Sequence, residues 1–245
     1  MLLREFIRQI ILESESCRSP KVIFMAGGPG SGKSHVINQL GLRQRMRVIN
    51  PDDQYEAAMK AECIPMDRAS LMDEYKPLKD EYLSAEESGD LEAMSRIRPE
   101  YERLRDILSR NMTLFTQARS QAKKDAAACC LNKVDYIVDG TGGQLREISQ
   151  QVEKAKEAGY DFAMIYVHVP LEESQRRNYE RSKQPEPGRT LTTKTVKRSW
   201  EAVNRNKQAY EEMFGNNFFY VVNTREESEE SINSVRSNLS RFLDT

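Results

Sequence analysis

The chain of 245 residues has few of the side chains that build metal and redox sites. It contains two histidines, His35 and His168, and four cysteines, at positions 17, 63, 129 and 130. The adjacent Cys129 and Cys130 lack metal-ligand spacing and lie in an alanine-rich stretch that is typical of a helix. We therefore expect reduced, packed thiols and no zinc site.

Long apolar runs and an excess of charge of one sign are also missing. No apolar run approaches the roughly 18 residues that a membrane-spanning helix needs, so we expect no membrane span and a reducing cytoplasm. The formal net charge is −1, which excludes a basic footprint over the whole surface. Any nucleic-acid contact would need a local basic patch.

The first residues do not form a secretory signal, because charged side chains interrupt the apolar ones. The apolar residues instead have helical spacing, which predicts an amphipathic helix over 1–16; they are Leu3, Phe6, Ile7, Ile10 and Ile11. Two interpretations remain open. This helix packs against the core, or it docks onto a second subunit or a protein partner of unknown identity.

A glycine-rich motif carries the strongest functional signal. Residues 27–34 read Gly-Gly-Pro-Gly-Ser-Gly-Lys-Ser, a complete Gly-x4-Gly-Lys-Ser phosphate-binding loop, directly after the apolar run 22–26. In such a loop backbone N–H groups bind nucleotide phosphates, Lys33 reaches the β- and γ-phosphates, and the Ser34 hydroxyl binds Mg²⁺. A helix from His35 to about Leu40 is expected to follow. The expected cofactors are ATP and Mg²⁺, and the expected nucleotide-binding residues are Gly27, Gly28, Pro29, Gly30, Ser31, Gly32, Lys33, Ser34 and His35.

Short apolar segments predict the strands of the fold. Besides 22–26 they cover 46–50, 136–139, 162–169 and 218–223, with helical segments between them. This alternation predicts an α/β protein with a five-stranded and mostly parallel sheet in one domain over 1–245. With the phosphate-binding loop after the first strand, we expect the three-layer fold of P-loop NTPases. Further helices are expected over 144–158, ending at Gly159, and over 226–243.

The stretch 54–133 is too long for an ordinary crossover between strands. Its apolar residues keep helical spacing over many turns, with expected breaks at 88–90 and at Arg98-Pro99. We interpret it as a large helical insertion that forms the substrate region, as in small kinases. The alternative is a structural hairpin that only enlarges the domain.

Two neighbouring carboxylates follow the second strand, in the sequence Asn50-Pro51-Asp52-Asp53. We expect this strand beside the phosphate-binding strand, with its carboxylate facing the nucleotide. There Asp52 could take a proton from an acceptor hydroxyl or orient Mg²⁺. The alternative is a helix N-cap. We favour the base for Asp52 and the cap for Asp53, which is also a candidate substrate contact.

The third predicted strand ends in Asp139-Gly140-Thr141. A carboxylate that ends an apolar strand is typical of the residue that holds Mg²⁺ opposite the loop serine, so Asp139 and Ser34 are the expected metal ligands. Thr141 offers a hydroxyl to a substrate.

Segment 171–210 is locally basic, with ten Lys and Arg against five Glu. Arg177 and Arg181 are four residues apart and share a helix face, as expected for a lid that clamps polyphosphate. The alternative is a solvated helix face. Trp200 and Tyr210 are interpreted as core residues.

Together these positions resemble the zeta-toxin-like and polynucleotide-kinase-like P-loop kinases over about residues 21–215, apart from the insertion. The shared features are the loop 27–34, Asp52, Asp139-Gly140-Thr141, Gly159-Tyr160, Val169-Pro170, the arginine helix and Gly188-Arg189. The segments around Asp52 and Arg177 also resemble bacteriophage polynucleotide kinase, and the amphipathic leader is similar to leaders of some tailed-phage proteins. A phage-encoded chain would work in the host cytoplasm.

The resemblance implies catalytic roles for Lys33, Asp52, Arg177 and Arg181, and substrate contacts by Thr141, Arg176 and Arg189. Two positions depart from the family: Tyr55 stands where an arginine is common, and Leu191 where a proline is usual. Both bear on the phosphate acceptor.

The expected activity is transfer of the ATP γ-phosphoryl group to a hydroxyl of a nucleotide-sugar, a nucleotide or a nucleic acid. A polynucleotide or modified-base DNA kinase is one alternative. An ATP-binding switch or assembly subunit without kinase activity is the alternative from another class.

Overall fold

The computed structural model describes residues 18–184 and 191–245, which form two compact units. The first unit contains residues up to 49, then 125–170 and 199–245, and the second contains 50–124 and 171–198. The expected amphipathic helix over 1–16 and the candidate Arg189 lie outside the described residues.

A five-stranded sheet forms the centre of the first unit. Its strands are β1 (Lys21–Ala26), β2 (Arg47–Ile49), β3 (Tyr136–Asp139), β4 (Asp161–His168) and β5 (Phe218–Val222). They lie in the order β2-β3-β1-β4-β5 and every pair is parallel, which confirms the predicted α/β fold of P-loop NTPases with a five-stranded parallel sheet. All six residues of β1 are buried, as expected for a central parallel strand covered on both faces.

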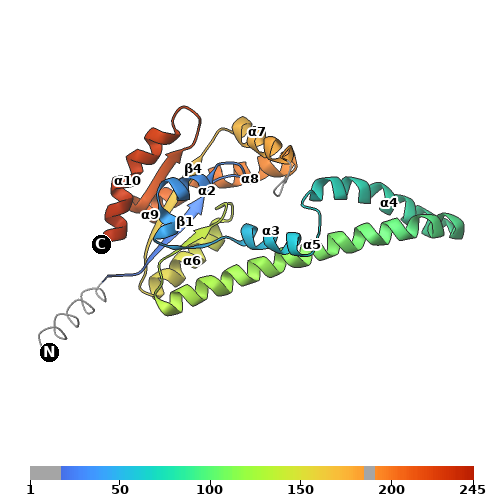
Figure 1. Cartoon of the computed structure of the whole chain (residues 1–245), viewed down its shortest axis with the longest axis horizontal. Helices are drawn as coiled ribbons and strands as arrows, with labels where there is room; N and C mark the ends of the chain where they lie inside the picture. The colour runs from blue at the N-terminus through green and yellow to red at the C-terminus, as the bar shows by residue number, and fades with distance from the viewer. Residues whose placement is uncertain (1–17, 185–190) are drawn as a thin grey trace, which may run out of the picture. The chain divides into compact units, whose positions relative to one another are not determined.

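Helices cover both faces of this sheet and make three layers. On one face the apolar side chains of β1, β4 and β5 pack against α2 (Lys33–Gln39) and α10 (Ser228–Asp244), which lies beside β5 (Figure 1). On the other face Phe24 and Phe162 contact Phe214 of α9 (Lys207–Phe214), and the Tyr166 hydroxyl bonds Asn204 of α8 (Thr193–Arg205). Helix α6 (Leu145–Glu157) packs on β4.

The sheet order corrects one expectation. The second strand does not lie beside β1, because β3 lies between them. Sequence order alone cannot fix which strands pair, since pairing depends on how the helical connections cross the sheet. The strand that ends in Asp139 is therefore the neighbour of the phosphate-binding strand.

The second unit is built from helices. They are α3 (Pro51–Ala61), α4 (Arg68–Ser88), the first part of α5 (Leu91–Asn132), α7 (Leu171–Ser182) and the start of α8. Helices α4 and α5 run side by side after the turn at Gly89 (Figure 1). Tyr82 stacks on Tyr101 with ring centroids 4.6 Å apart. The predicted break at 88–90 is thus a tight helical hairpin.

The predicted break at Arg98-Pro99 is wrong, because α5 continues through Pro99. A proline inside a helix removes one backbone hydrogen bond and crowds the preceding turn, which costs about 3 kcal/mol. The apolar spacing does not change at this point, and Ile97 and Leu104, on either side of the proline, are both buried. Packing of these side chains stabilises the helix against the cost of the proline.

Candidate functional site

The glycine-rich motif forms the turn between β1 and α2. Gly27 has φ +153°, and a Cβ on this residue would lie 2.6 Å from both the Ser31 hydroxyl and the Val167 carbonyl oxygen. Gly30 and Gly32 also have positive φ. Only glycine allows the backbone to turn this tightly against its neighbours. The motif therefore forms a compact loop at the carboxyl edge of the sheet.

Lys33 is the first residue of α2, and its ammonium group donates a hydrogen bond of 3.0 Å to the Gly27 carbonyl. This bond folds the lysine over the loop that precedes it. Ser34 and His35 follow in the first turn of α2, and both are exposed. Lys33 therefore lies against the loop, and Ser34 is accessible to a ligand.

The loop also fits a phosphate group chemically. The Ser31 side chain is fully buried, and its hydroxyl has no hydrogen-bond partner among residues 18–184 and 191–245. A buried polar atom without a partner is costly and points to a ligand that satisfies it. Backbone N–H groups, a lysine and such a hydroxyl are the donors that bind phosphate oxygens.

The turn after β3 lies directly against this loop. Asp139 ends β3 in register with Met25 of β1 and is almost fully buried, with 4% of its surface exposed. Two residues later the Thr141 carbonyl accepts a 2.9 Å hydrogen bond from the N–H of Gly27. The structure therefore brings the expected metal ligand Asp139 and the expected substrate contact Thr141 together with the phosphate-binding loop.

Two side chains from the C-terminal part of the chain hold this turn, and sequence reasoning did not find their role. The Tyr210 hydroxyl donates a 2.6 Å hydrogen bond to the Gly142 carbonyl. The Asn206 amide donates to the carbonyls of Gly142 and Gly143, at 3.2 and 3.1 Å. Tyr210 is fully buried, so the expectation of a core residue is correct but incomplete.

A third residue that the sequence did not reveal holds the phosphate-binding loop itself. Asn223 follows β5, is 5% exposed, and donates a 2.7 Å hydrogen bond from its amide to the Ser31 carbonyl. Its side-chain oxygen accepts a hydrogen bond from Ser228, which fixes the orientation of the amide. Asn223 therefore fixes the Ser31 peptide within the phosphate-binding loop.

Trp200 also contacts the loop. Its side-chain N–H donates a 2.8 Å hydrogen bond to the Val169 carbonyl, and its ring would lie 3.3 Å from a Cβ on Gly28. Trp200, which we expected in the core, therefore also packs against the phosphate-binding loop. The adjacent His168 is half-buried, and burial and the nearby Lys207 charge lower its pKa below the ordinary value.

The second unit contains both carboxylates that follow β2. Asn50, not an aspartate, is the N-cap of α3, and its side-chain oxygen accepts hydrogen bonds from the N–H groups of Asp52 and Asp53. Pro51 occupies the first helical position, which suits its fixed φ. The N-cap interpretation of Asp52 and Asp53 is thus wrong, and both exposed carboxylates lie in the first turn of the helix.

Tyr55, where the resembling family commonly has an arginine, lies one turn further along α3 and is 5% exposed. Its hydroxyl donates a 2.9 Å hydrogen bond to the fully buried Asn111 of α5, and its ring packs edge-on against Phe115. This residue connects α3 to α5.

The predicted arginine helix is α7. Arg176 is ion-paired to Glu173 at 2.7 Å and also to Glu180, while Arg177 is paired to Glu173. Hydrogen bonds to Glu173, chiefly from Arg176 and also from Arg177, lower the pKa of this carboxyl to about 2. Arg181 is exposed. Part of the basic charge of segment 171–210 is therefore compensated within the helix.

The chain beyond α7 returns to that helix. The Asn178 amide and the Leu191 backbone exchange two hydrogen bonds, at 2.8 and 3.2 Å. Among the predicted site residues, the loop 27–35, Asp139 and Thr141 belong to the first unit. Asp52, Asp53, Arg176, Arg177 and Arg181 belong to the second.

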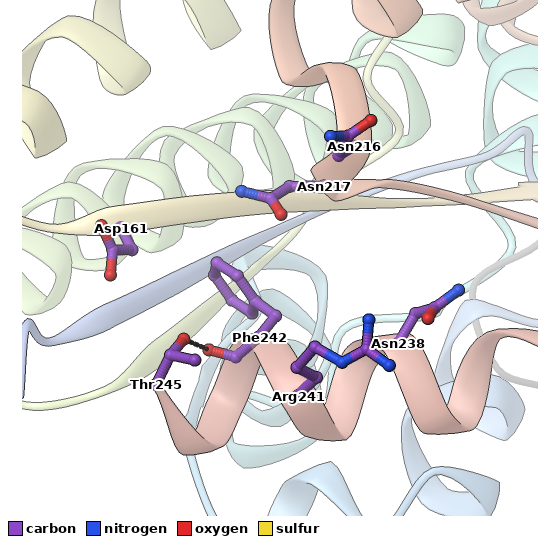
Figure 2. Close-up of a pocket in the computed structure, with 7 residues that line it drawn as sticks. All are labelled: Asp161, Asn216, Asn217, Asn238, Arg241, Phe242 and Thr245. Carbon is purple, nitrogen blue, oxygen red and sulfur yellow. Dashed lines mark hydrogen bonds between the residues drawn. The ribbon is translucent and has the colours of Figure 1, made fainter.

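A pocket of about 560 Å³ lies at the amino-terminal edge of the sheet, where β4 begins and α10 ends (Figure 2). Its lining is mostly polar: Asp161, Asn216, Asn217, Asn238, Arg241, Phe242 and Thr245. The Asp161 carboxylate accepts a 2.6 Å hydrogen bond from the buried Lys21. The phosphate-binding loop is at the opposite edge, so this pocket is not the nucleotide site.

Within the described ranges, none of the helices has the length and apolar character that crossing a membrane requires.

Comparison with known proteins places the site in a family. The family model described as an AAA domain matches residues 22–205, which include the phosphate-binding loop, both candidate carboxylates and the arginine helix. No curated protein matches the chain.

Solved structures give a second comparison. A candidate kinase from Chloroflexus aurantiacus shares 14% identity with a TM-score of 0.53, over 90% of this chain and 99% of that one, which shows a common fold. A chain of the Pnkp1/Rnl/Hen1 RNA repair complex is 18% identical (TM-score 0.49) over 79% of this chain, which spans only 47% of that chain's length. A structure of the PezAT toxin–antitoxin system of Streptococcus pneumoniae is 11% identical, with a TM-score of 0.49. The match covers 93% of this chain and 89% of that chain.

Proposed function

The chain belongs to the AAA domain family, and we propose that it is an ATP- and Mg²⁺-dependent kinase that phosphorylates a hydroxyl group. The observation that carries the proposal is the hydrogen bond between Gly27 and Thr141. It joins a complete phosphate-binding loop to the turn that follows Asp139. Phosphoryl transfer needs these two elements together, one for the phosphates and one for the metal that neutralises them.

The residues of the first unit bind the nucleotide and the metal in this proposal. The loop N–H groups and Lys33 would bind the phosphates of ATP, and Ser34 and Asp139 would hold Mg²⁺. The bound metal would supply positive charge that offsets the negative charge of the phosphates. Since the protein contributes little covalent chemistry in this reaction, its work is to position the groups and stabilise charge.

The acceptor is activated by Asp52 in this proposal. All five strands are parallel, so the carboxyl end of β2 lies at the same edge as Ala26 and Asp139. Asp52 is three residues beyond Ile49, within about 10 Å of that edge by chain length. Its carboxylate takes the proton of the acceptor hydroxyl. The hydroxyl oxygen then bonds the γ-phosphorus, the bond to the β,γ-bridging oxygen breaks, and ADP leaves.

Arg177 and Arg181 of α7 stabilise the transferring group, with Arg176 and Arg189 as contacts of the substrate. One well-placed arginine lowers the barrier of such a reaction by several kcal/mol. Asp53 and Thr141 complete the acceptor site. Tyr55 is not an acceptor contact in this proposal, because its hydroxyl is bound to Asn111.

The acceptor class is a nucleotide-sugar, a nucleotide or a nucleic-acid end. Incubation with γ-labelled ATP and a panel of UDP-sugars, nucleosides and oligonucleotides tests the proposal. We expect label in one acceptor class. Activity on an oligonucleotide that falls steeply with salt would identify a polynucleotide or modified-base DNA kinase, because Lys and Arg release counterions on binding phosphates. Slow ATP hydrolysis without a labelled acceptor would contradict the proposal and favour an ATP-dependent switch.

A further inference from the structure

Asn206 and Tyr210 both hold the turn that follows Asp139, through its backbone carbonyls. Gly142 has φ +71°, and as glycine it has no side chain that packs and fixes the chain locally. Two successive carbonyls in this turn instead accept hydrogen bonds from other parts of the chain. The Thr141 carbonyl accepts from Gly27, and the Gly142 carbonyl accepts from both Tyr210 and Asn206.

Asn206 does not have its usual local role. It occupies the N-cap position of α9, where an asparagine side chain normally accepts a hydrogen bond from a backbone N–H of the first turn. Here it makes no such bond. Its amide donates instead to Gly142 and Gly143, more than sixty residues earlier in the chain. Asn206 therefore stabilises the turn that follows Asp139 and not the start of its own helix.

Tyr210 donates to the same turn from a fully buried position. Burial raises the pKa of this tyrosine to about 12, so its hydroxyl keeps its proton and remains a donor at neutral pH. The donors are thus an amide and a neutral hydroxyl, and neither adds charge next to Asp139.

We infer that Asn206 and Tyr210 are positioning residues for the magnesium site, because they fix the turn that begins at Asp139. The inference rests on the proposed function for the identity of the metal ligand. Partners that orient a metal ligand typically change metal affinity by about 10- to 100-fold when they are removed.

The test compares three variants by calorimetric titration with ATP, in EDTA and at increasing Mg²⁺. Tyr210→Phe removes one oxygen, and Asn206→Leu removes both amide hydrogen bonds at similar volume. Tyr166→Phe is the matched control, because Tyr166 is also buried and its hydroxyl bonds Asn204, outside the turn. We expect about a tenfold higher Mg²⁺ requirement in the first two variants, unchanged ATP affinity in EDTA, and no change in the control.

An unaltered Mg²⁺ requirement in a folded Tyr210→Phe protein overturns the inference, whether or not Asn206→Leu folds. An equal rise in Tyr166→Phe also overturns it, because the effect would then be general. The proposed kinase function fails separately, if the wild type binds Mg²⁺ and ATP but phosphorylates no acceptor. A wild type that binds no ATP overturns both.

Discussion

Gly142 shows how strictly a single position near the site is defined. Its backbone has φ +71°, and a Cβ at this position would lie 2.7 Å from the Cβ of Ala26, the last residue of β1. Both restrictions act on the same residue. Gly159 has nearly the same φ, +72°, but a Cβ there would meet nothing within 4 Å. The two glycines therefore separate the cost of the backbone conformation from the cost of the contact.

We predict that Gly159→Ala lowers the free energy of unfolding by about 1 kcal/mol, the cost of placing alanine in a left-handed conformation. Gly142→Ala should cost about 1–3 kcal/mol more, because the added methyl also overlaps Ala26. It should also weaken ATP binding in the presence of Mg²⁺, since it shifts the turn that follows Asp139. Urea unfolding and ATP titration of both variants measure this. Equal stability losses in the two variants would contradict the account.

The role of a residue could be predicted from the sequence where it depends on neighbouring residues. It could not be predicted where it depends on partners far away in the chain. The loop 27–34 is fully specified by its own glycines, lysine and serine. The capping of α3 is also local, yet only Asp52 and Asp53 were considered as caps, and the structure shows that Asn50 is the acceptor. For Asn206, Tyr210 and Asn223 no sequence pattern exists, because their partners are backbone carbonyls far away in the chain.

At the scale of elements, α5 is the main departure from expectation. It extends over 42 residues and includes Pro99. The apolar spacing of the segment predicted a helix on both sides, and the proline predicted its end. Packing prevailed, because Ile97 and Leu104 remain buried on either side of the proline. The low helix propensity of a single residue is a weak signal when a continuous apolar face favours the helix.

Replacing this proline tests that explanation. We predict that Pro99→Ala raises the free energy of unfolding by about 1–3 kcal/mol, because it restores a backbone hydrogen bond and removes a steric clash. Glu102→Ala, at an exposed position of the same helix, is the control and should change stability by less than about 0.5 kcal/mol. Thermal unfolding followed by circular dichroism gives both values. A less stable Pro99→Ala variant would show that α5 needs the proline.

The strands were the most predictable elements. Each is a short apolar run, and all five lie within one or two residues of their predicted ranges. Their order in the sheet was less accessible, and β3 rather than β2 lies beside β1. Strand type follows from local composition, whereas pairing is decided by the connections and by packing between distant segments.

At the scale of the whole molecule, the proposed chemistry draws on both compact units. The first unit supplies the phosphate-binding loop and Asp139, and the second supplies Asp52 and the arginines of α7. Along the chain, β2 leads into α3 and β4 leads into α7. A kinase with this division of residues needs Asp52 for transfer but not for ATP binding.

The most direct test is therefore single-turnover transfer from γ-labelled ATP by wild type, Asp52→Asn and Asp53→Asn, with the acceptor that the panel identifies. Loss of a general base typically slows the reaction about 10²- to 10⁴-fold. We predict a loss of this size for Asp52→Asn with unchanged ATP affinity, and a smaller loss for Asp53→Asn, because Asp53 contacts the acceptor in this proposal but does not take its proton. Near-normal transfer by Asp52→Asn would contradict the account.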